Sequence, residues 1–449
     1  VVTMMLIPQS LAYALLAGLP AETGLYASIF PLIAYAVFGS SRALSVGPVA
    51  VVSLMTMVAL SKIVEQGSVD YISAATALAL LTGGFLLLMG TFKLGFIANF
   101  LSHTVVSGFI TASGILIALS QLRHIAGISA HGDTAPEILR TLAVNMTTIN
   151  GTNAAIGLLV LVFLFWARSG VAPLLTQRGL TQNNAALIAK AAPVIGVVTT
   201  IFCVWYWRLD LQGVAIVGTI PTGLPRIAMP QISFALIEQL WLPALSIAII
   251  GYVESVSVGK TLAAKKRTNI DTNQELFGLG AANVASAISG GFPVTGGLSR
   301  SVVNYDAGAV TQAASIYAAI GIAFASLYLT PALYFLPKAT LAATIIVAVL
   351  SIVDLAIVRK TWTFSASDFR ALMITILGTL LFGVEAGVLC GVLLSIGLYL
   401  YRTSIPHIAE VGLVEGTQHF RNIQRYRVTT NVHVLNLRVD ESLFFANAS

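Results

Sequence analysis

One short segment of the chain combines a helix breaker, glycines that expose the backbone, and a cation. It reads Gly290-Gly291-Phe292-Pro293-Val294-Thr295-Gly296-Gly297-Leu298-Ser299-Arg300-Ser301, and it interrupts an apolar region. A charge at membrane depth costs at least ~2.5 kcal/mol, so Arg300 requires a partner there. Because unpaired backbone N–H groups and a guanidinium both attract negative charge, the segment indicates an anion-binding site and anion transport.

A similar break occurs earlier in the chain and also leads into a short apolar run. The stretch Phe38 to Pro48 precedes Val49 to Leu60, just as the first segment leads into Leu298 to Asn304. At 1.5 Å per residue, neither run can cross ~30 Å of hydrocarbon. We therefore predict two half-helices, one with Gly47 as N-cap and Pro48 as its first residue, the other with Thr295 as N-cap.

Two half-helix N-termini that meet near the middle of a membrane would form a cradle for an anion. Each terminus carries about +0.5 charge, so with Arg300 the local charge is near +2, which matches a dianion such as sulfate. Two alternatives stay open. Both breaks could be packing kinks, since Gly and Pro are frequent in membrane helices, or Arg300 could pair with a carboxylate of the protein.

Glu254 is the clearest carboxylate within an apolar run. On a helix it shares one face with Gly251 and Ser257, so this face offers a carboxylate, a hydroxyl and space for another group. Burial favours protonation, and a neutral Glu can carry a proton. Ionised Glu254 would lower the cradle charge to about +1, whereas protonation would restore about +2 and let proton and dianion bind together. A structural salt bridge between Glu254 and Arg300 is equally compatible with the sequence.

Gln9 and Tyr13 are a further pair of polar side chains in an apolar run. They are four residues apart, so on a helix they lie on one face and could supply hydrogen bonds and an aromatic wall. Taken alone, such residues are more typical of hydrogen bonding between membrane helices.

The composition predicts an all-α polytopic membrane protein surrounded by the lipid bilayer. Of 449 residues, 57% are hydrophobic and 9% charged, and the mean hydropathy is +0.89; soluble proteins have about a quarter charged residues. The net charge of +6 is attributed to topology rather than to nucleic acid, because Lys and Arg gather in cytoplasmic loops. Thirteen lie in loops on the starting side and six in opposite loops, so both termini are expected in the cytoplasm of a cell (inner or plasma) membrane protein.

We expect about fourteen transmembrane segments in two inverted repeats of seven, residues 1–207 and 232–405, within a transporter domain of residues 1–405. The half-helices are segments 3 and 10. The stretch Gly213 to Pro230 joins the repeats, and the apolar runs Ala314 to Leu336 and Ala371 to Leu400 are long enough for two segments each.

The two ends of the chain differ in character. The chain begins inside an apolar run without a Met, so we expect residues before Val1 to be missing. After Pro406 the composition becomes polar, and Val432 to Val439 alternates like a strand. Residues 406–449 are therefore interpreted as a linker and the truncated start of a cytoplasmic domain.

Several of these motifs together resemble the SulP family of sulfate permeases and anion exchangers. The resemblance rests on Ile7-Pro8-Gln9-Ser10-Leu11-Ala12-Tyr13-Ala14, Phe38-Gly39-Ser40-Ser41-Arg42, Val46-Gly47-Pro48-Val49-Ala50, Gly251-Tyr252-Val253-Glu254-Ser255 and Leu298-Ser299-Arg300-Ser301. It covers essentially the whole membrane part. In addition, Val434 to Arg438 with Leu443 to Ala448 resembles the opening of the family's α/β cytoplasmic STAS domain.

The resemblance implies a homodimer in which a core domain carries the anion past a gate domain in an elevator motion. The implied anion site comprises Val46, Gly47 and Pro48, which face Thr295, Gly296, Gly297, Leu298 and Ser299, with Gln9 and Tyr13 lining it. Glu254 matches a carboxylate linked to cation coupling, and Arg300 a basic position beside the site. Some bicarbonate carriers of the family have Asp and sodium dependence at the position of Glu254, so Glu here favours protons. Regulatory partners would act through the STAS domain.

The sequence thus predicts a proton-coupled symporter for sulfate or a related oxyanion. Bicarbonate, chloride or a dicarboxylate could replace sulfate, because a cradle of backbone N–H groups distinguishes charge more than shape. An anion channel on the same scaffold is an alternative of a different class. The apolar spans contain no Ser/His/Asp, paired-carboxylate or metal constellation, which argues against an enzyme, and no cofactor or metal is expected.

Overall fold

The computed structural model describes residues 2–440 except 67, 100–102, 129–131, 133, 183–184, 186–187, 190 and 405–407. The chain divides into two compact units, Val1–Gly391 and Val392–Ser449. The division falls within helix α19 (Val384–Thr403).

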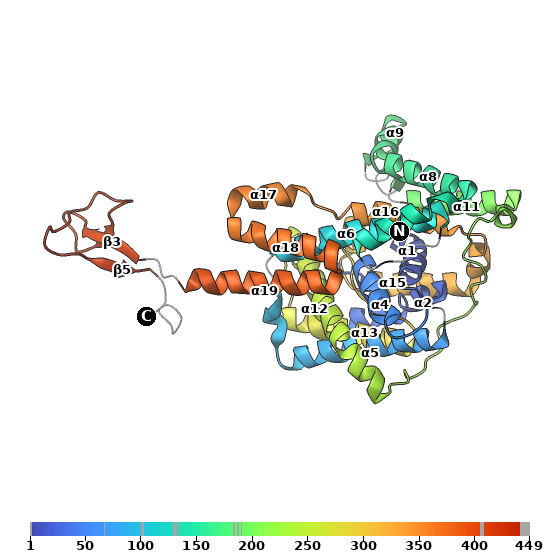
Figure 1. Cartoon of the computed structure of the whole chain (residues 1–449), viewed down its shortest axis with the longest axis horizontal. Coiled ribbons are helices and arrows are strands. Elements are labelled where there is room, and N and C mark those ends of the chain that lie inside the picture. Colours follow the sequence, from blue (N-terminus) through green and yellow to red (C-terminus); the bar gives the residue numbers. More distant parts are fainter. Residues whose placement is uncertain are drawn as a thin grey trace. The chain divides into compact units, whose positions relative to one another are not determined.

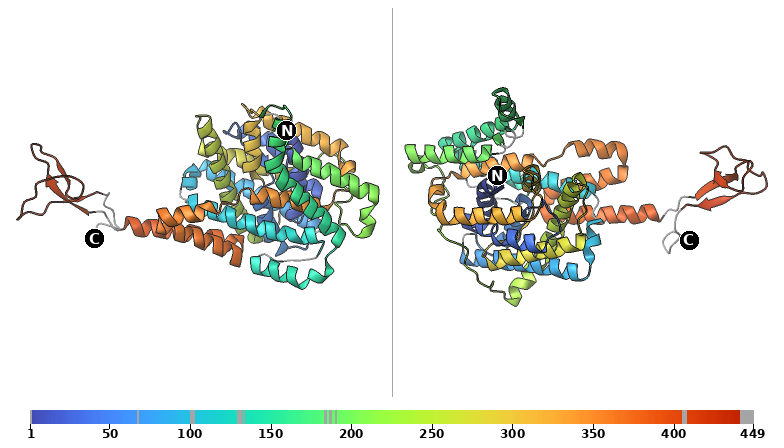
Figure 2. Two further views of the ribbon diagram at one scale, coloured as in Figure 1. Left: turned by 90° about the horizontal axis from the view of Figure 1, so that it is seen from above. Right: turned by 180° about the vertical axis from the view of Figure 1, so that it is seen from behind.

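The first unit is a bundle of helices (Figures 1 and 2). In chain order its main elements are α1 (Val2–Leu16), α2 (Ala21–Tyr26), α3 (Phe30–Phe38), β1 (Val46–Gly47), α4 (Ala50–Ser61), α5 (Val69–Thr91), α6 (His103–Ala126), α7 (Ala135–Val144), α8 (Gly151–Trp166), α9 (Ala172–Gln177), α11 (Ala192–Trp207), α12 (Phe234–Lys265), α13 (Thr272–Ile288), β2 (Thr295–Gly296), α14 (Leu298–Asp306), α15 (Ala313–Tyr328), α16 (Lys338–Leu350), α17 (Ala356–Phe364) and α18 (Ala366–Phe382).

Many of these helices are apolar enough to lie in a membrane, in agreement with a multi-pass membrane protein. Within the described residues, five stretches are also long enough to cross one: Ala21–Phe38, Val69–Thr91, Thr104–Ala126, Gly151–Gln177 and Phe234–Lys265. Five shorter apolar helices accompany them: Val2–Leu16, Ala50–Ser61, Ala192–Trp207, Ala313–Tyr328 and Lys338–Leu350.

The two predicted breaks meet in the structure. Strands β1 and β2 pair antiparallel, with Val46 opposite Gly296 and Gly47 opposite Thr295. Each strand leads into a short helix, 12 residues for α4 and 9 for α14. At 1.5 Å per residue these helices are about 18 Å and 14 Å long, so the predicted half-helices are present.

The predicted N-caps were wrong. Helix α4 begins at Ala50 with Val49 as its N-cap, and α14 begins at Leu298 with Gly297 as its N-cap. Gly47 is held extended by its pairing with β2, so the helix cannot start there. The hydroxyl of Thr295 donates to the Gly251 carbonyl oxygen at 2.6 Å and therefore does not cap α14.

The two long apolar runs behave differently. Ala371 to Leu400 contains parts of both α18 and α19, which are separated by Gly383 at φ 92°. Ala314 to Leu336, in contrast, forms the single helix α15 followed by a short 3₁₀ helix, Thr330–Leu333. Pro331 explains the difference, because it lacks an N–H and disfavours the α conformation of the residue before it.

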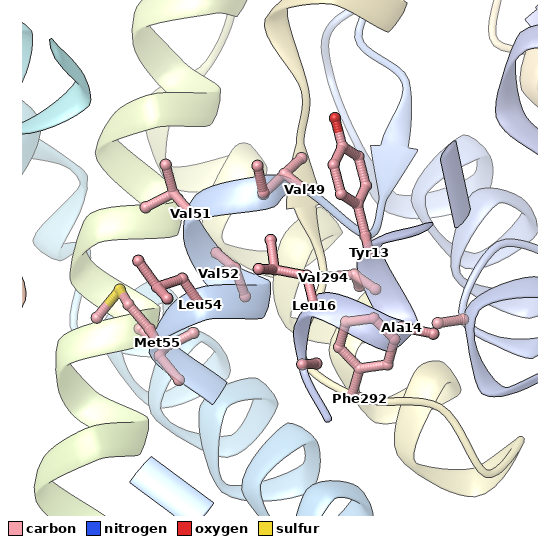
Figure 3. Close-up of a cluster of buried hydrophobic side chains, with 14 of the residues drawn as sticks. Tyr13, Ala14, Leu16, Val49, Val51, Val52, Leu54, Met55, Phe292 and Val294 are labelled. Atoms are coloured by element: carbon pink, nitrogen blue, oxygen red, sulfur yellow. The ribbon is translucent and has the colours of Figure 1, made fainter. Parts of the chain in front are cut away.

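Buried apolar side chains surround the two breaks. Phe292 and Val294, which precede β2, lie near Leu16 of α1, and Val52, Leu54 and Met55 of α4 belong to the same buried cluster (Figure 3). All six are at most 2% exposed. The tightly packed core therefore fixes the backbone on both sides of the strand crossing.

The second unit contains a three-stranded antiparallel sheet in the order β4-β3-β5, made of β3 (Ile408–Leu413), β4 (Phe420–Asn422) and β5 (Leu437–Val439). The strand predicted over Val432 to Val439 is limited to its last three residues, because Asn431 and Val434 form an isolated bridge across a turn. The segment Leu443 to Ala448 lies outside the described residues.

Candidate functional site

The first break is held by a buried carboxylate of α13. Glu275 is 0% exposed. Its Oε2 accepts a hydrogen bond from the Tyr35 hydroxyl at 2.7 Å, and its Oε1 accepts from the backbone N–H groups of Ser40 and Ser41, both at 2.9 Å. The Ser40 hydroxyl donates to the same Oε1 at 2.6 Å. One side chain therefore fixes the turn that leads into β1.

The second break is held by the other end of α13. The Asn283 amide donates to the Val294 carbonyl oxygen and accepts from the Val294 N–H, both at 2.9 Å. The Ser286 hydroxyl donates to the Phe292 carbonyl oxygen at 2.6 Å. Helix α13 thus positions both breaks, and it satisfies backbone groups that extended chain inside a membrane would otherwise leave unpaired.

A chain of hydrogen bonds joins β2 to α12. The Gly296 N–H donates to Ser255 Oγ at 2.8 Å, and the Ser255 and Thr295 hydroxyl oxygens are 2.6 Å apart. Because the Thr295 hydroxyl donates to the Gly251 carbonyl oxygen, the Ser255 hydroxyl donates to Thr295. These bonds fix β2 against the turn of α12 that carries Glu254.

Helix α14 in turn holds the chain that enters β1. The Gly297 N–H donates to the Ser45 carbonyl oxygen at 3.2 Å, and the Ser45 N–H donates to Ser301 Oγ at 3.0 Å. The Asn304 amide donates to the Ala43 carbonyl oxygen at 3.1 Å. The two breaks are therefore one structural unit, although more than 240 residues separate Ser45 from Gly297 along the chain.

Arg300 lies across the strand crossing. It is 2% exposed, and its Nη2 donates to the carbonyl oxygens of Gly47 at 3.0 Å and Thr295 at 3.3 Å. A Cβ atom on Gly47 would lie 2.7 Å from Arg300 Nη1, and one on Gly297 would lie 2.9 Å from Arg300 Nε. Glycine at both positions therefore lets the guanidinium lie against the backbone.

A small cavity of 40 Å³ opens beside Arg300. Its walls come from α1, the start of α4, α12, α14 and the end of α16, and its lining residues are Gln9, Tyr13, Val49, Ala50, Val51, Glu254, Gly297, Leu298, Arg300, Ala348, Val349 and Ile352. Figure 3 shows the Tyr13 ring beside Val49, at the start of α4. We call this space the central cavity.

Three side chains in the central cavity carry a buried polar atom that has no hydrogen-bond partner in the described part of the chain. These atoms are Gln9 Oε1, Glu254 Oε2 and Arg300 Nη1. Such atoms are rare in folded proteins, because each forfeits its hydrogen bond to water. Their convergence on one cavity indicates a site for a polar ligand, with Nη1 as a donor suited to an anion.

Glu254 and Arg300 do not form the salt bridge that the sequence left open. Both side chains are described, both line the central cavity, and no ion pair within 4.0 Å joins them. Glu254 is 8% exposed, so the carboxyl group is buried without a neutralising contact. The arrangement leaves both groups available to a ligand and a proton.

The structure separates the predicted site residues into two layers. Gln9, Tyr13, Glu254, Gly297, Leu298 and Arg300 line the central cavity. Val46, Gly47, Thr295 and Gly296 form the strand crossing, Pro48 follows it, and none of these five lines the cavity. Ser257 lines no part of the cavity; it lies one turn farther along α12, where its carbonyl oxygen accepts a bond from Thr261. The side chain of Ser299 lies outside the described residues.

Residues that sequence reasoning missed are those that position the breaks. Glu275, Ser255, Asn283 and Asn304 each bond a partner that is distant along the chain or in an irregular segment. Ser255 and Asn283 give one sequence signal, a polar residue within a largely apolar helix, whereas the helix of Asn304 is polar at several other positions. Glu275 is less conspicuous still, because an acidic residue in the first turn of a helix is ordinarily explained by the helix dipole.

Comparisons with known proteins agree with this architecture. The model of the Sulfate permease family matches residues 1–375. A chloroplastic sulfate transporter 4.1 of Arabidopsis thaliana is 37% identical over 100% of this chain and 64% of its own length. A probable sulfate transporter of Mycobacterium tuberculosis is 34% identical over 99% of this chain and 76% of its own length. This chain thus spans just under two thirds of the Arabidopsis relative.

Solved structures give the same result. The murine anion transporter Slc26a9, in its inward-facing state, matches with a TM-score of 0.84 and 26% identity, over 96% of this chain and 72% of that one. The transmembrane domain of a cyanobacterial bicarbonate transporter, BicA, matches with a TM-score of 0.71 and 20% identity, over 88% of this chain and 95% of that one. At that identity the second likeness concerns the fold alone.

Proposed function

The chain belongs to the sulfate permease family, and from this premise we propose that it is a secondary transporter that carries sulfate or a related oxyanion together with a proton. The observation that carries the proposal is the convergence of three unpartnered polar atoms, of Gln9, Glu254 and Arg300, on the central cavity. It is consistent with the sulfate transporters named among its relatives.

Anion binding follows from the charges around the central cavity. The N-terminal residues of α4 and α14, Ala50 and Leu298, both line it, and so does Arg300. Two helix N-termini at about +0.5 each and one guanidinium give about +2, which is balanced by a divalent oxyanion. Arg300 Nη1 and the N–H groups at the helix starts supply the hydrogen bonds.

Proton coupling follows from the position of Glu254. An ionised carboxylate in the same cavity would reduce the local charge to about +1 and would repel a dianion. Protonation removes that repulsion and adds an O–H donor beside the anion. No ion pair with Arg300 holds the carboxylate ionised. Proton binding to Glu254 and sulfate binding to the cavity therefore favour each other.

Transport requires the central cavity to open on each side in turn. Its 40 Å³ is little more than the ~30 Å³ that one water molecule occupies in the liquid, so the walls must separate to admit a larger anion. We assign the movement to an elevator motion within a homodimer, with fourteen segments in two inverted repeats. Both termini are assigned to the cytoplasmic side of the cell membrane, and the polar segment after α19 to a regulatory domain.

The test is uptake of radiolabelled sulfate into proteoliposomes that contain the full-length protein. The membrane potential is held at zero, and uptake is followed with and without an inward proton gradient. Bicarbonate, chloride and fumarate serve as competitors. Gradient-driven accumulation is expected; saturable uptake without accumulation would refute proton coupling, and the absence of sulfate uptake would refute the substrate.

A further inference from the structure

A second, larger cavity lies near the C-terminal end of α1. It has a volume of 410 Å³ and is lined in part by Gln66, Gln121, Arg123, His124 and Lys338. We propose that this cavity, called the vestibule below, is a second anion site that binds an inorganic dianion before it reaches the central cavity. The substrate assignment rests on the proposed function; the anion site itself does not.

Basic side chains from distant parts of the chain converge on the vestibule. Arg123 and His124 belong to the last turn of α6, and Lys338 is the first residue of α16. No Asp or Glu occurs among the described residues that line it. A concave surface with charges of one sign focuses its field and raises the local concentration of counter-ions.

The orientation of His124 adds a hydrogen-bond donor. Arg123 Nε donates to His124 Nε2 at 3.2 Å. A neutral imidazole that accepts at Nε2 carries its proton on Nδ1, so its remaining polar atom is a donor. Gln66 and Gln121 contribute amide groups to the same walls. Donors and positive charge therefore occupy part of the wall of a volume within the range of ligand pockets, ~300 to 1,000 Å³, and the rest of the wall is mostly apolar.

The vestibule and the central cavity lie along the same two helices. On α1, Ala12 lines the vestibule and the adjacent Tyr13 lines the central cavity. On α16, Ile345 lines the vestibule and Val349 lines the central cavity. Four residues of helix span about 6 Å, so along α16 the two cavities lie about one helical turn apart.

The test uses Lys338→Gln in membrane vesicles of uniform orientation, both right-side-out and inside-out. The KM for sulfate should rise about tenfold in one orientation only. The inhibition constant for chloride should rise about threefold. Because the interaction energy is proportional to the ligand's charge, the fold-change for a dianion is about the square of the fold-change for a monoanion. Both effects should shrink as ionic strength increases.

Two control variants separate the charge from the fold. Lys338→Arg keeps the charge and should retain the KM of the unaltered protein. Arg226→Gln removes an exposed charge that does not line the vestibule and should leave KM unchanged. Equal changes for sulfate and chloride, or equal changes in both vesicle orientations, would overturn the proposal in favour of a structural role for Lys338.

A structural measurement keeps the result independent of transport. Selenate has the charge and shape of sulfate and gives an anomalous X-ray signal. Crystals of the full chain soaked in selenate should show a selenium peak beside Lys338, and crystals of the Lys338→Gln variant should not. Without sulfate uptake, this peak would still support the vestibule while the proposed substrate fails. Electron density beside Lys338 that lacks a selenium peak, as a lipid phosphate would give, would overturn the vestibule proposal.

Discussion

Replacing Glu275 by Ala should destabilise the first unit strongly, although this residue does not line the central cavity. The substitution removes the acceptor of four hydrogen bonds: one from Tyr35, one from Ser41, and two from Ser40. The Ser40 hydroxyl can still donate to the Asp271 carbonyl oxygen, which lies 3.4 Å away, so three donors are left without a partner. At roughly 1 to 1.5 kcal/mol each, the loss is about 3 to 4.5 kcal/mol.

The assay is thermal unfolding of the purified protein in detergent, followed by sulfate uptake. With an unfolding entropy of about 2.1 cal/mol/K per residue for a unit that ends at Gly391, the loss corresponds to a decrease in Tm of about 4 to 5 °C. The Tm of Glu275→Gln should lie between those of Glu275→Ala and the unaltered protein. The glutamine carbonyl oxygen can accept the three bonds of Oε1, and the Tyr35 hydroxyl can turn to accept from the amide. Glu65→Ala, at an exposed carboxylate, is the control. A Tm within about 1 °C of the unaltered protein for Glu275→Ala would refute this account of the turn.

Three further predictions concern the central cavity and the strand crossing. One proton per sulfate across two pH units supports up to about 100-fold accumulation at zero potential, at 1.36 kcal/mol per unit. Glu254→Gln should abolish that accumulation, whereas Glu238→Gln, at an exposed position of the same helix, should preserve it; undiminished accumulation in Glu254→Gln would contradict the proton role. Arg300→Gln should raise the Kd for sulfate by about the square of the factor by which it raises the Kd for chloride, for example about 100-fold against tenfold. Equal fold-changes in the two Kd values would indicate that Arg300 has a purely structural role. Thr295→Val should lower unfolding free energy by about 1 to 3 kcal/mol in denaturation, because Ser255 loses its acceptor, whereas Thr295→Ser should not; equal stability of the two variants would argue against the hydroxyl chain.

The sequence predicted the two breaks because each departs from the pattern of a membrane helix. Glycines and a proline precede each apolar run, and each run is too short to cross the bilayer. Family motifs placed Gln9, Tyr13, Glu254 and Arg300 near one anion site, and the structure brings these four side chains to one cavity.

The starting residue of each half-helix could not be predicted from local preferences. Thr295 is a favourable N-cap by type, but its hydroxyl is used by Gly251 of a distant helix. Pro48 suits the first turn of a helix, but β1 must remain extended to pair with β2, so α4 begins later. In both cases a tertiary contact outweighs a preference of about 1 kcal/mol.

The sequence by itself determined the membrane setting, the interruption of two spans, and the residue types suited to an anion. All three depend on composition and spacing along the chain. Only the tertiary structure decided that α13 fixes both breaks through Glu275 and Asn283, and that Glu254 and Arg300 share a cavity without forming an ion pair. The physical reason is that these relations join groups many residues apart, and the packing of helices, rather than local sequence, sets the distances between them.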